Sequence, residues 1–189
     1  MRRVLASASP RRRSILETLG LRFEVVPSVV EEVAVPGISA TELARNLALD
    51  KAREVASRED GFVLAADTVV VVDGEALGKP VDDADAMRML ALLSGRWHEV
   101  VTGVALVWDG GLEDLAVTTR VRFRELTEAR MRRYVATGEG RDKAGGYAVQ
   151  GIGAGLVTRI EGSYSNVVGL PAAETVDLLE RAGAVEAWP

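Results

Sequence analysis

The chain has 189 residues, 48% hydrophobic and 27% charged, which is the composition of an ordinary soluble globular protein. Its net charge of −5 excludes the overall basic field of a nucleic-acid-binding protein. Cysteine is absent and His98 is the single histidine, which excludes disulfides, thiolate nucleophiles, cysteine zinc sites and multi-histidine metal sites.

The chain begins with a predicted strand at residues 4–6, followed by a small-residue loop and a helix. Ser9 is a suitable N-cap and Pro10 suits the first helical position, while Gly20 marks the end of the helix. A strand, a small-residue loop and a helix N-terminus together form the general anion-binding arrangement, because backbone N–H groups point outward there.

The first turn of this helix carries Arg11, Arg12 and Arg13, although the partly positive N-terminus of a helix favours acidic residues. A bound polyphosphate would make these charges favourable, with Ser7 and Ser9 as additional hydroxyl donors. The other explanation is an exposed basic turn that costs a few tenths of a kcal/mol per charge. The residues alone leave both explanations open.

Strands and helices alternate along the rest of the chain, and two turn signals indicate antiparallel hairpins, at Asp73-Gly74 and at 109–111. The pattern predicts an α/β fold with a mixed sheet, and no linker divides residues 1–189, so we expect a single domain. Further predicted elements are an extended segment at 22–32, helices at 41–57, 82–93, 127–137 and 170–183, strands at 61–72, 98–108, 115–126 and 155–162, and a glycine-rich stretch at 138–155.

The helix predicted at 41–57 carries a lysine on its apolar stripe. Leu43, Leu47, Lys51 and Val55 follow one another at intervals of four residues. A lysine in this position extends to solvent from the edge of the core, or it points toward an anion.

An aspartate interrupts the apolar strand "FVLAADTVVVV". Both faces of this strand are apolar, so Asp67 is costly to bury unless it is paired, hydrogen-bonded or bound to a metal. A mid-strand carboxylate of this kind indicates a functional site. Carboxylates also suit Mg²⁺ or Mn²⁺, and Glu31 and Glu32 could supply a second one.

Two glycine-containing segments resemble nucleotide-binding motifs without matching them. "GEALGKP", which contains Lys79, is one residue short of a P-loop and has proline where serine or threonine is required. "GIGAG" at 151–155 lacks the strand before and the helix after it that a dinucleotide fingerprint needs. We therefore expect a close backbone approach or a sharp turn at 151–155.

Six ordered segments together resemble the Maf family of nucleoside triphosphate pyrophosphatases, also called septum formation proteins. They are "LASASPRRRSIL", "LALDKA", "AADTVVVVDGEALGKP", "LSGRWHEVVTGVAL", "DKAGGYAVQGIG" and "GSYSNVVGLP". The resemblance covers essentially the whole chain. It implies an elongated mixed sheet with two lobes around a central cleft, as in inosine triphosphate pyrophosphatases. It also implies cleavage of a nucleoside triphosphate between the α and β phosphates, with Mg²⁺ or Mn²⁺.

The resemblance assigns roles to the unusual residues. It implies that Asp67 is the proton acceptor and that Asp67 and Glu32 help to hold the metal. The phosphate-binding residues that it implies are Ser7, Arg11, Arg12, Lys51 and Lys79.

Three further positions distinguish the branches of the family. Arg11, Thr68 and Gln150 resemble the branch that acts on dTTP and UTP. The amide of Gln150 offers both a donor and an acceptor, as the edge of uracil or thymine requires. Modified pyrimidine triphosphates are a further class of substrate that we expect.

The competing hypotheses are a nucleotide-binding regulator of septum formation with little turnover, and a nucleic-acid-binding protein. The pI near 5.1 and the few aromatic residues disfavour nucleic acid as a partner. We expect no membrane association, no signal peptide and a cytoplasmic location, because no long apolar run is present. The resemblance also admits a homodimer.

Overall fold

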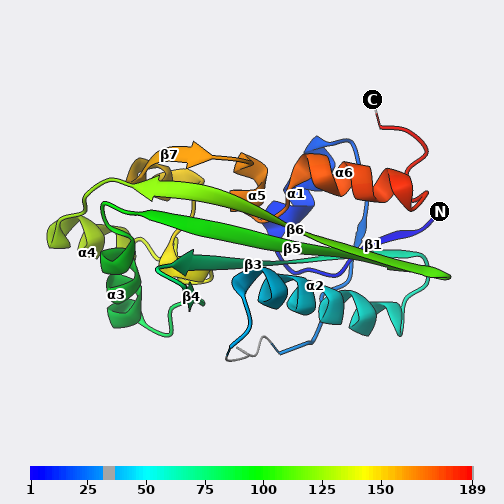
Figure 1. The fold of residues 1–189 in the computed structure, drawn as a ribbon, viewed down its shortest axis with the longest axis horizontal. Helices are drawn as coiled ribbons and strands as arrows, with labels where there is room; N and C mark the ends of the chain where they lie inside the picture. The colour runs from blue at the N-terminus through cyan, green and yellow to red at the C-terminus, as the bar shows by residue number, and fades with distance from the viewer. Residues whose placement is uncertain (32–36, 189) are drawn as a thin grey trace. The chain divides into compact units, whose positions relative to one another are not determined.

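The structure is a computed structural model that describes residues 1–31 and 37–188. The described residues form two compact units (Figure 1). The first unit is built from Met1–Asp67, Thr102–Val117 and Gly169–Pro189, and the second from Thr68–Val101 and Thr118–Val168. The elements are β1 (Arg3–Leu5), α1 (Pro10–Thr18), β2 (Glu24–Val25), α2 (Ala40–Ala56), β3 (Phe62–Val72), β4 (Glu75–Leu77), α3 (Asp83–Leu93), β5 (Trp97–Trp108), β6 (Gly111–Phe123), α4 (Glu128–Ala136), η1 (Ala144–Gly146), η2 (Gly151–Leu156), β7 (Val157–Glu161), α5 (Tyr164–Val168) and α6 (Ala172–Arg181).

The strands form a seven-stranded sheet in the order β2-β1-β3-β5-β6-β7, with β4 paired to β3. Strand β1 pairs in parallel with β2 and β3, whereas the β3–β4 and β6–β7 pairs are antiparallel. The predicted α/β fold with a mixed sheet and flanking helices is therefore confirmed. The single domain, the lobes and the cleft stay predictions. Strands β3, β5 and β6 each contribute residues to both units.

In the first unit, helices cover both faces of the strands. Side chains alternate between the faces of a strand, so Leu5 and Leu64 lie in one core cluster and Val4 and Val63 in the other. The first cluster includes residues of α1 and α6, and the second includes residues of α2. Figure 1 shows α1 and α6 on one side of these strands and α2 on the other.

The buried face of α2 differs from the predicted stripe. Leu43 and Leu47 are only half-buried, and the buried residues are Ala44, Ala48, Lys51, Ala52 and Val55. The reason is close packing: a Cβ added to Gly103 of β5 would lie 2.2 Å from the carbonyl oxygen of Ala44. At this separation the helix presents alanines to the sheet, and the larger leucines lie beside the contact.

Local signals in the sequence correspond to local structure at the helix ends and turns. The capping box at α2 is complete, because Ser39 Oγ accepts from the Glu42 amide and the Glu42 carboxylate accepts from the Ser39 amide. Asp73 and Gly74 both have positive φ, 50° and 82°, as the β3–β4 hairpin turn requires. At α1, Ser9 is the N-cap residue, but within the described chain its side chain makes no capping hydrogen bond.

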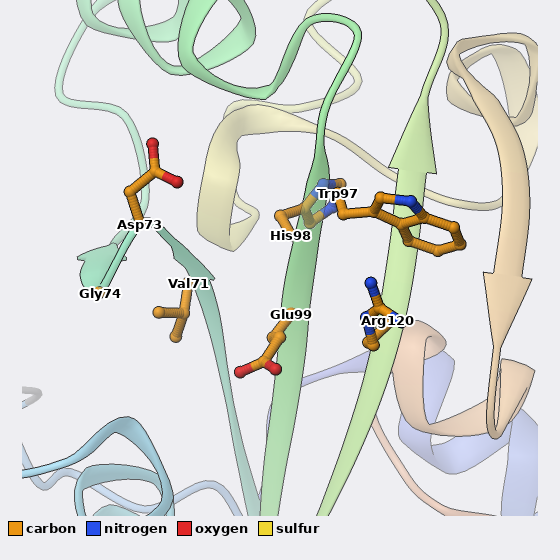
Figure 2. Close-up of a pocket in the computed structure, with 7 residues that line it drawn as sticks. All are labelled: Val71, Asp73, Gly74, Trp97, His98, Glu99 and Arg120. Atoms are coloured by element: carbon orange, nitrogen blue, oxygen red, sulfur yellow. The ribbon is translucent and has the colours of Figure 1, made fainter.

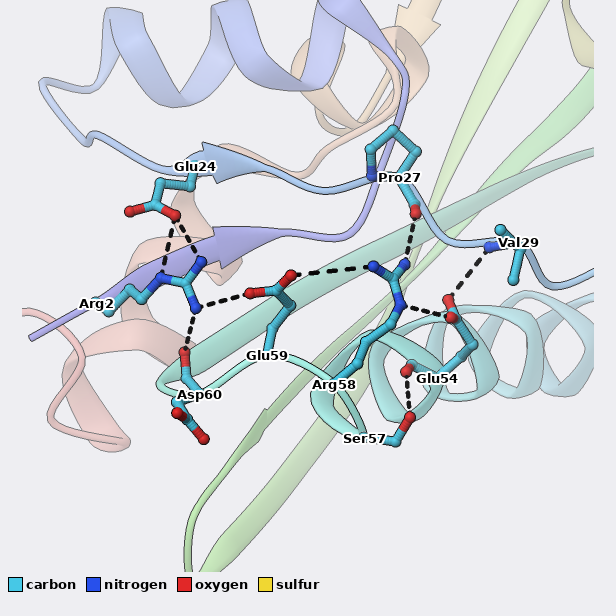
Figure 3. A network of polar contacts seen from close by, with 9 residues as sticks. All are labelled: Arg2, Glu24, Pro27, Val29, Glu54, Ser57, Arg58, Glu59 and Asp60. Carbon is cyan, nitrogen blue, oxygen red and sulfur yellow. Dashed lines mark hydrogen bonds and ion pairs between the residues drawn. The ribbon is translucent and has the colours of Figure 1, made fainter.

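A polar network joins β2 and the segment after it to Arg2 and to the C-terminal end of α2 (Figure 3). The guanidinium of Arg2 contacts Glu24 of β2 at 2.7 Å and Glu59 at 2.8 Å. Arg58 contacts Glu54 of α2 at 2.9 Å and donates to the carbonyl of Pro27 at 2.9 Å. Exposed ion pairs contribute little stability singly, so the network orients the segment after β2 more than it stabilises the unit.

In the second unit, α3 packs against α4 and η1, and the core includes an aromatic cluster. His98, Phe123 and Tyr147 are buried with their rings edge to face, and His98 Nε2 lies 2.7 Å from the Tyr147 hydroxyl. Burial lowers the pKa of His98 to about 4 and raises that of Tyr147. His98 is therefore a packing residue of this core.

Candidate functional site

The loop between β1 and α1 brings Ser7 and Arg12 together in the first unit. The buried Ser7 Oγ accepts from Arg12 Nη1 at 3.1 Å and from the Ser9 amide at 3.2 Å. Arg12 Nε donates to the carbonyl of Gly169 at 2.8 Å. The guanidinium is thus held in a fixed orientation at the start of α1, beside the outward-pointing amides of the first turn.

The three arginines of this turn have different surroundings. Arg13 is exposed and pairs with Glu17, one helical turn later, at 2.7 Å, so the exposed-turn explanation holds for Arg13. Arg11 is half-buried, as is Arg12. The polyphosphate explanation therefore concerns Arg11 and Arg12 alone.

The second pair in the first unit joins α2 to β3. Lys51 Nζ contacts Asp67 Oδ1 at 2.6 Å, and their side chains are only 10% and 9% exposed. Asp67 reaches Lys51 because it lies on the same face of β3 as Val63 and Ala65, which pack against α2. Lys51 is buried, so the expectation that it extends to solvent is wrong, and its partner is the Asp67 carboxylate of the protein itself. That Lys51 points into a cleft toward a bound anion stays a prediction. The predicted need of Asp67 for a partner is confirmed.

Of the other predicted residues, three belong to the second unit, Glu31 is exposed in the first unit, and one lies outside the described residues. Thr68 is half-buried on β3, and Lys79 is exposed just after β4. Gln150 is exposed and immediately precedes η2. Glu32 lies outside the described residues. The structure thus brings together two pairs, Ser7 with Arg12 and Lys51 with Asp67, and their roles stay predictions.

Asp67 has donor chemistry that suits a divalent metal. Among residues 1–31 and 37–188, no group of three or more histidine, cysteine, aspartate or glutamate side chains could hold a metal ion. Mg²⁺ is usually held by one or two carboxylates together with substrate phosphates. A single carboxylate such as Asp67 fits that mode of binding.

A groove of about 330 Å³ lies in the second unit (Figure 2). Figure 2 shows Trp97 and Glu99 on β5 and Arg120 on the neighbouring strand β6. The guanidinium of Arg120 lies 4.5 Å from the ring centre of Trp97 and 2.9 Å from Glu161. None of the described residues predicted for the site lines this groove.

Two contacts at the site positions have no counterpart in the sequence prediction. The Gly169 carbonyl holds Arg12 across 157 residues, and no local pattern indicates such a pairing. Glu139 binds the backbone just after Gln150. The signal that could have found Glu139 is an acidic residue near a glycine-rich stretch whose amides need an acceptor.

The model of the Maf-like protein family matches residues 2–182. The chain belongs to the Maf family. A relative named dTTP/UTP pyrophosphatase from Geotalea uraniireducens is 52% identical over 97% of this chain and 96% of its own length. Another of the same name, from Myxococcus xanthus, is 53% identical over 98% of this chain and 94% of its own.

Among solved structures, this Maf-family chain is similar to one described as a nucleoside-triphosphatase / dITP/XTP pyrophosphatase from Mycobacterium abscessus. The two share 20% identity at a TM-score of 0.47, over 99% of this chain and 98% of the other. Within residues 1–31 and 37–188, every helix is too short or too polar to cross a membrane.

Proposed function

We propose that the chain is a nucleoside triphosphate pyrophosphatase that hydrolyses dTTP and UTP between the α and β phosphates, giving the monophosphate and pyrophosphate. Membership of the Maf family and relatives that are about half identical over nearly their whole length support this. The structural observation that carries the proposal is the buried Lys51–Asp67 pair, located in the same unit as Ser7 and Arg12.

In the proposed reaction, cationic side chains neutralise the triphosphate. Arg12 is already oriented by Ser7 and Gly169, so it needs little rearrangement when a phosphate binds. Fixed donors of this kind stabilise charge that develops in the transition state. We assign the same role to Arg11 and Lys79.

Asp67 is the proposed base. Water attacks phosphorus, the proton of that water passes to Asp67, and the bond to the bridging oxygen between the α and β phosphates breaks as pyrophosphate leaves. Lys51 compensates the charge of the Asp67 carboxylate in its buried position. An ammonium has three N–H donors, so Lys51 can contact Asp67 and a substrate oxygen together.

We further propose that Asp67, with Glu32, holds a divalent ion that accompanies the triphosphate. Such an ion, Mg²⁺ or Mn²⁺, would supply additional charge neutralisation at the phosphates.

Pyrimidine preference is assigned to Gln150, Thr68 and Arg11. A glutamine side chain can donate and accept at the edge of uracil or thymine, whereas an ionised glutamate only accepts. The substitution Gln150→Glu should therefore reduce kcat/KM for dTTP and UTP relative to purine triphosphates.

The decisive experiment measures pyrophosphate release from dTTP, UTP, modified pyrimidine triphosphates, ATP and GTP, with Mg²⁺ or Mn²⁺. Products are separated chromatographically, so that a monophosphate with pyrophosphate is distinguished from a diphosphate with phosphate. The variant Asp67→Asn is compared with Asp177→Asn, which changes an exposed aspartate of α6.

Loss of a general base costs about 10²–10⁴-fold in rate, so we expect a loss of this size in Asp67→Asn and normal turnover in Asp177→Asn. Near-normal turnover in folded Asp67→Asn would remove this residue from the mechanism. Nucleotide binding without any turnover in the wild type would make the regulator of septum formation the better conclusion.

A further inference from the structure

The glycine-rich stretch after Gln150 encloses a carboxylate of the protein itself. The Ile152 amide donates to Glu139 Oε1 at 2.8 Å, and the Gly153 amide donates to Glu139 Oε2 at 2.7 Å. Successive backbone amides of this kind form an anion-binding concavity. Here the anion is the Glu139 side chain, so these two amides serve the protein's internal structure.

Through Tyr134, the Glu139 carboxylate is also linked to the backbone that precedes Gln150. The Tyr134 hydroxyl donates to Glu139 Oε2 at 2.9 Å and accepts from the Ala148 amide at 3.0 Å. The Tyr134 ring is buried, and this burial raises the pKa of its hydroxyl, which keeps the hydroxyl protonated as the donor. Tyr134 and Glu139 thus hold the backbone two residues before Gln150 and two and three residues after it. We call these two residues the clamp.

The glycines of the stretch are required by the clamp. Gly151 has a φ of +70°, and an added Cβ would lie 2.2 Å from Glu139 Oε1. A Cβ on Gly153 would lie 2.0 Å from the Ala148 carbonyl oxygen and 2.8 Å from the Tyr134 hydroxyl. The predicted close backbone approach at 151–155 is therefore confirmed, and the side chains that make it necessary are those of the clamp.

Hydrogen bonds fix the backbone on both sides of Gln150, in addition to the burial of Ala148 and Val149 before it. The side chain of Ile152 is 62% exposed and Gln150 is also exposed, so neither anchors the backbone in a core. Hydrogen bonds to a charged acceptor are about twice as strong as neutral ones. The backbone that follows Gln150 therefore depends on Glu139 for its position.

We infer that Glu139, together with Tyr134, is a positioning residue that sets base selectivity by fixing the backbone that presents Gln150. This inference rests on the proposed function, which assigns the base contact to Gln150. A side chain that makes directional hydrogen bonds to a base discriminates only if its backbone is held in place, because a displacement of about 1 Å can cost about 100-fold in rate.

The test uses Glu139→Gln, which keeps the shape of the side chain. A carboxylate accepts at both oxygens, whereas the glutamine NH2 group would face an N–H or O–H donor of the segment. Tyr134→Phe is the second variant, since it keeps the ring and removes only the hydroxyl. The matched control is Glu128→Gln, which changes an exposed glutamate of α4 that pairs with Arg132.

Two quantities are measured for each variant on the full chain: the ratio of kcat/KM for dTTP and UTP to that for ATP and GTP, and hydrogen exchange at the amides of Ile152 and Gly153. We expect this ratio to fall by about 10- to 100-fold in Glu139→Gln, mainly through KM, and to fall in the same direction in Tyr134→Phe. Faster exchange at both amides should accompany the fall in Glu139→Gln. Glu128→Gln should match the wild type in both.

The outcomes separate the inference from the proposed function. Wild-type selectivity in Glu139→Gln, or wild-type amide protection in it, overturns the inference alone. If Glu139→Gln does not fold, unchanged selectivity in Tyr134→Phe overturns it equally. A wild type that hydrolyses no triphosphate overturns the proposed function, and the inference falls with it.

Discussion

Breaking the buried Lys51–Asp67 ion pair from one side should destabilise the protein more than removing both charges. The two charged atoms lie 2.6 Å apart and the side chains are about nine-tenths buried. Removal of one partner leaves the other charge buried without compensation, which costs about 3–5 kcal/mol. We expect a loss of this size in Lys51→Met and in Asp67→Asn. The double variant should cost less than the larger single loss, because two uncharged side chains need no compensation.

Urea unfolding at fixed pH and salt measures these free energies for the wild type, both single variants and the double variant. The chain offers a matched control in Arg13–Glu17, a pair of nearly the same length, 2.7 Å, whose side chains are 62% and 54% exposed. Arg13→Met should cost at most about 0.5 kcal/mol. The reasoning is refuted if Lys51→Met is as mild as Arg13→Met, or if the two single losses simply add in the double variant.

Three further predictions concern stability. The native pKa of His98 of about 4, against 6.5 when unfolded, means that the unfolded chain binds the extra proton. The free energy of unfolding is therefore unaffected by protonation of His98 above pH 6.5, and it decreases as the pH falls from 6.5 toward 4. The stability difference between the wild type and His98→Gln should change by about 3 kcal/mol across this range, and a difference independent of pH would contradict it. Ser39→Ala removes the capping oxygen of α2 and should cost about 1 kcal/mol in thermal or urea unfolding; no loss would mean that the cap is dispensable. Gly103→Ala inserts a methyl group 2.2 Å from a backbone oxygen of α2 and should cost about 1–3 kcal/mol or more. Gly155→Ala, which meets no atom within 4 Å, serves as its control, and equal losses in the two would refute the close contact.

Sequence reasoning succeeded where the cause of a structure lies within a few residues. The capping box at Ser39 and the turn at Asp73 need only neighbours in the chain, so their residues suffice to predict them. The need of Asp67 for a partner also followed from one strand, because a carboxylate between apolar residues requires compensation.

The remaining features depend on pairs distant in sequence. The alanine face of α2 is buried because Gly103, on another strand, admits the helix closely. A pattern of side-chain size along one helix favours Leu43 and Leu47 and cannot include that neighbour. The contact between Glu139 and Gly153 likewise spans 14 residues without a periodic signal.

The core of the first unit is built from segments far apart in the sequence, which affects folding during synthesis of the chain. Leu5 and Leu64 lie in one cluster with Leu178 and Leu179 of α6, which leaves the ribosome well after β3. Roughly 100 residues separate β3 from α6, and the chain is synthesised at about 5–20 residues per second. The apolar surface that α6 covers is therefore exposed for several seconds. During that interval the nascent chain presents an incomplete sheet, the state in which strands pair with the wrong neighbour. We therefore expect newly made chains to be most prone to aggregation before α6 has emerged.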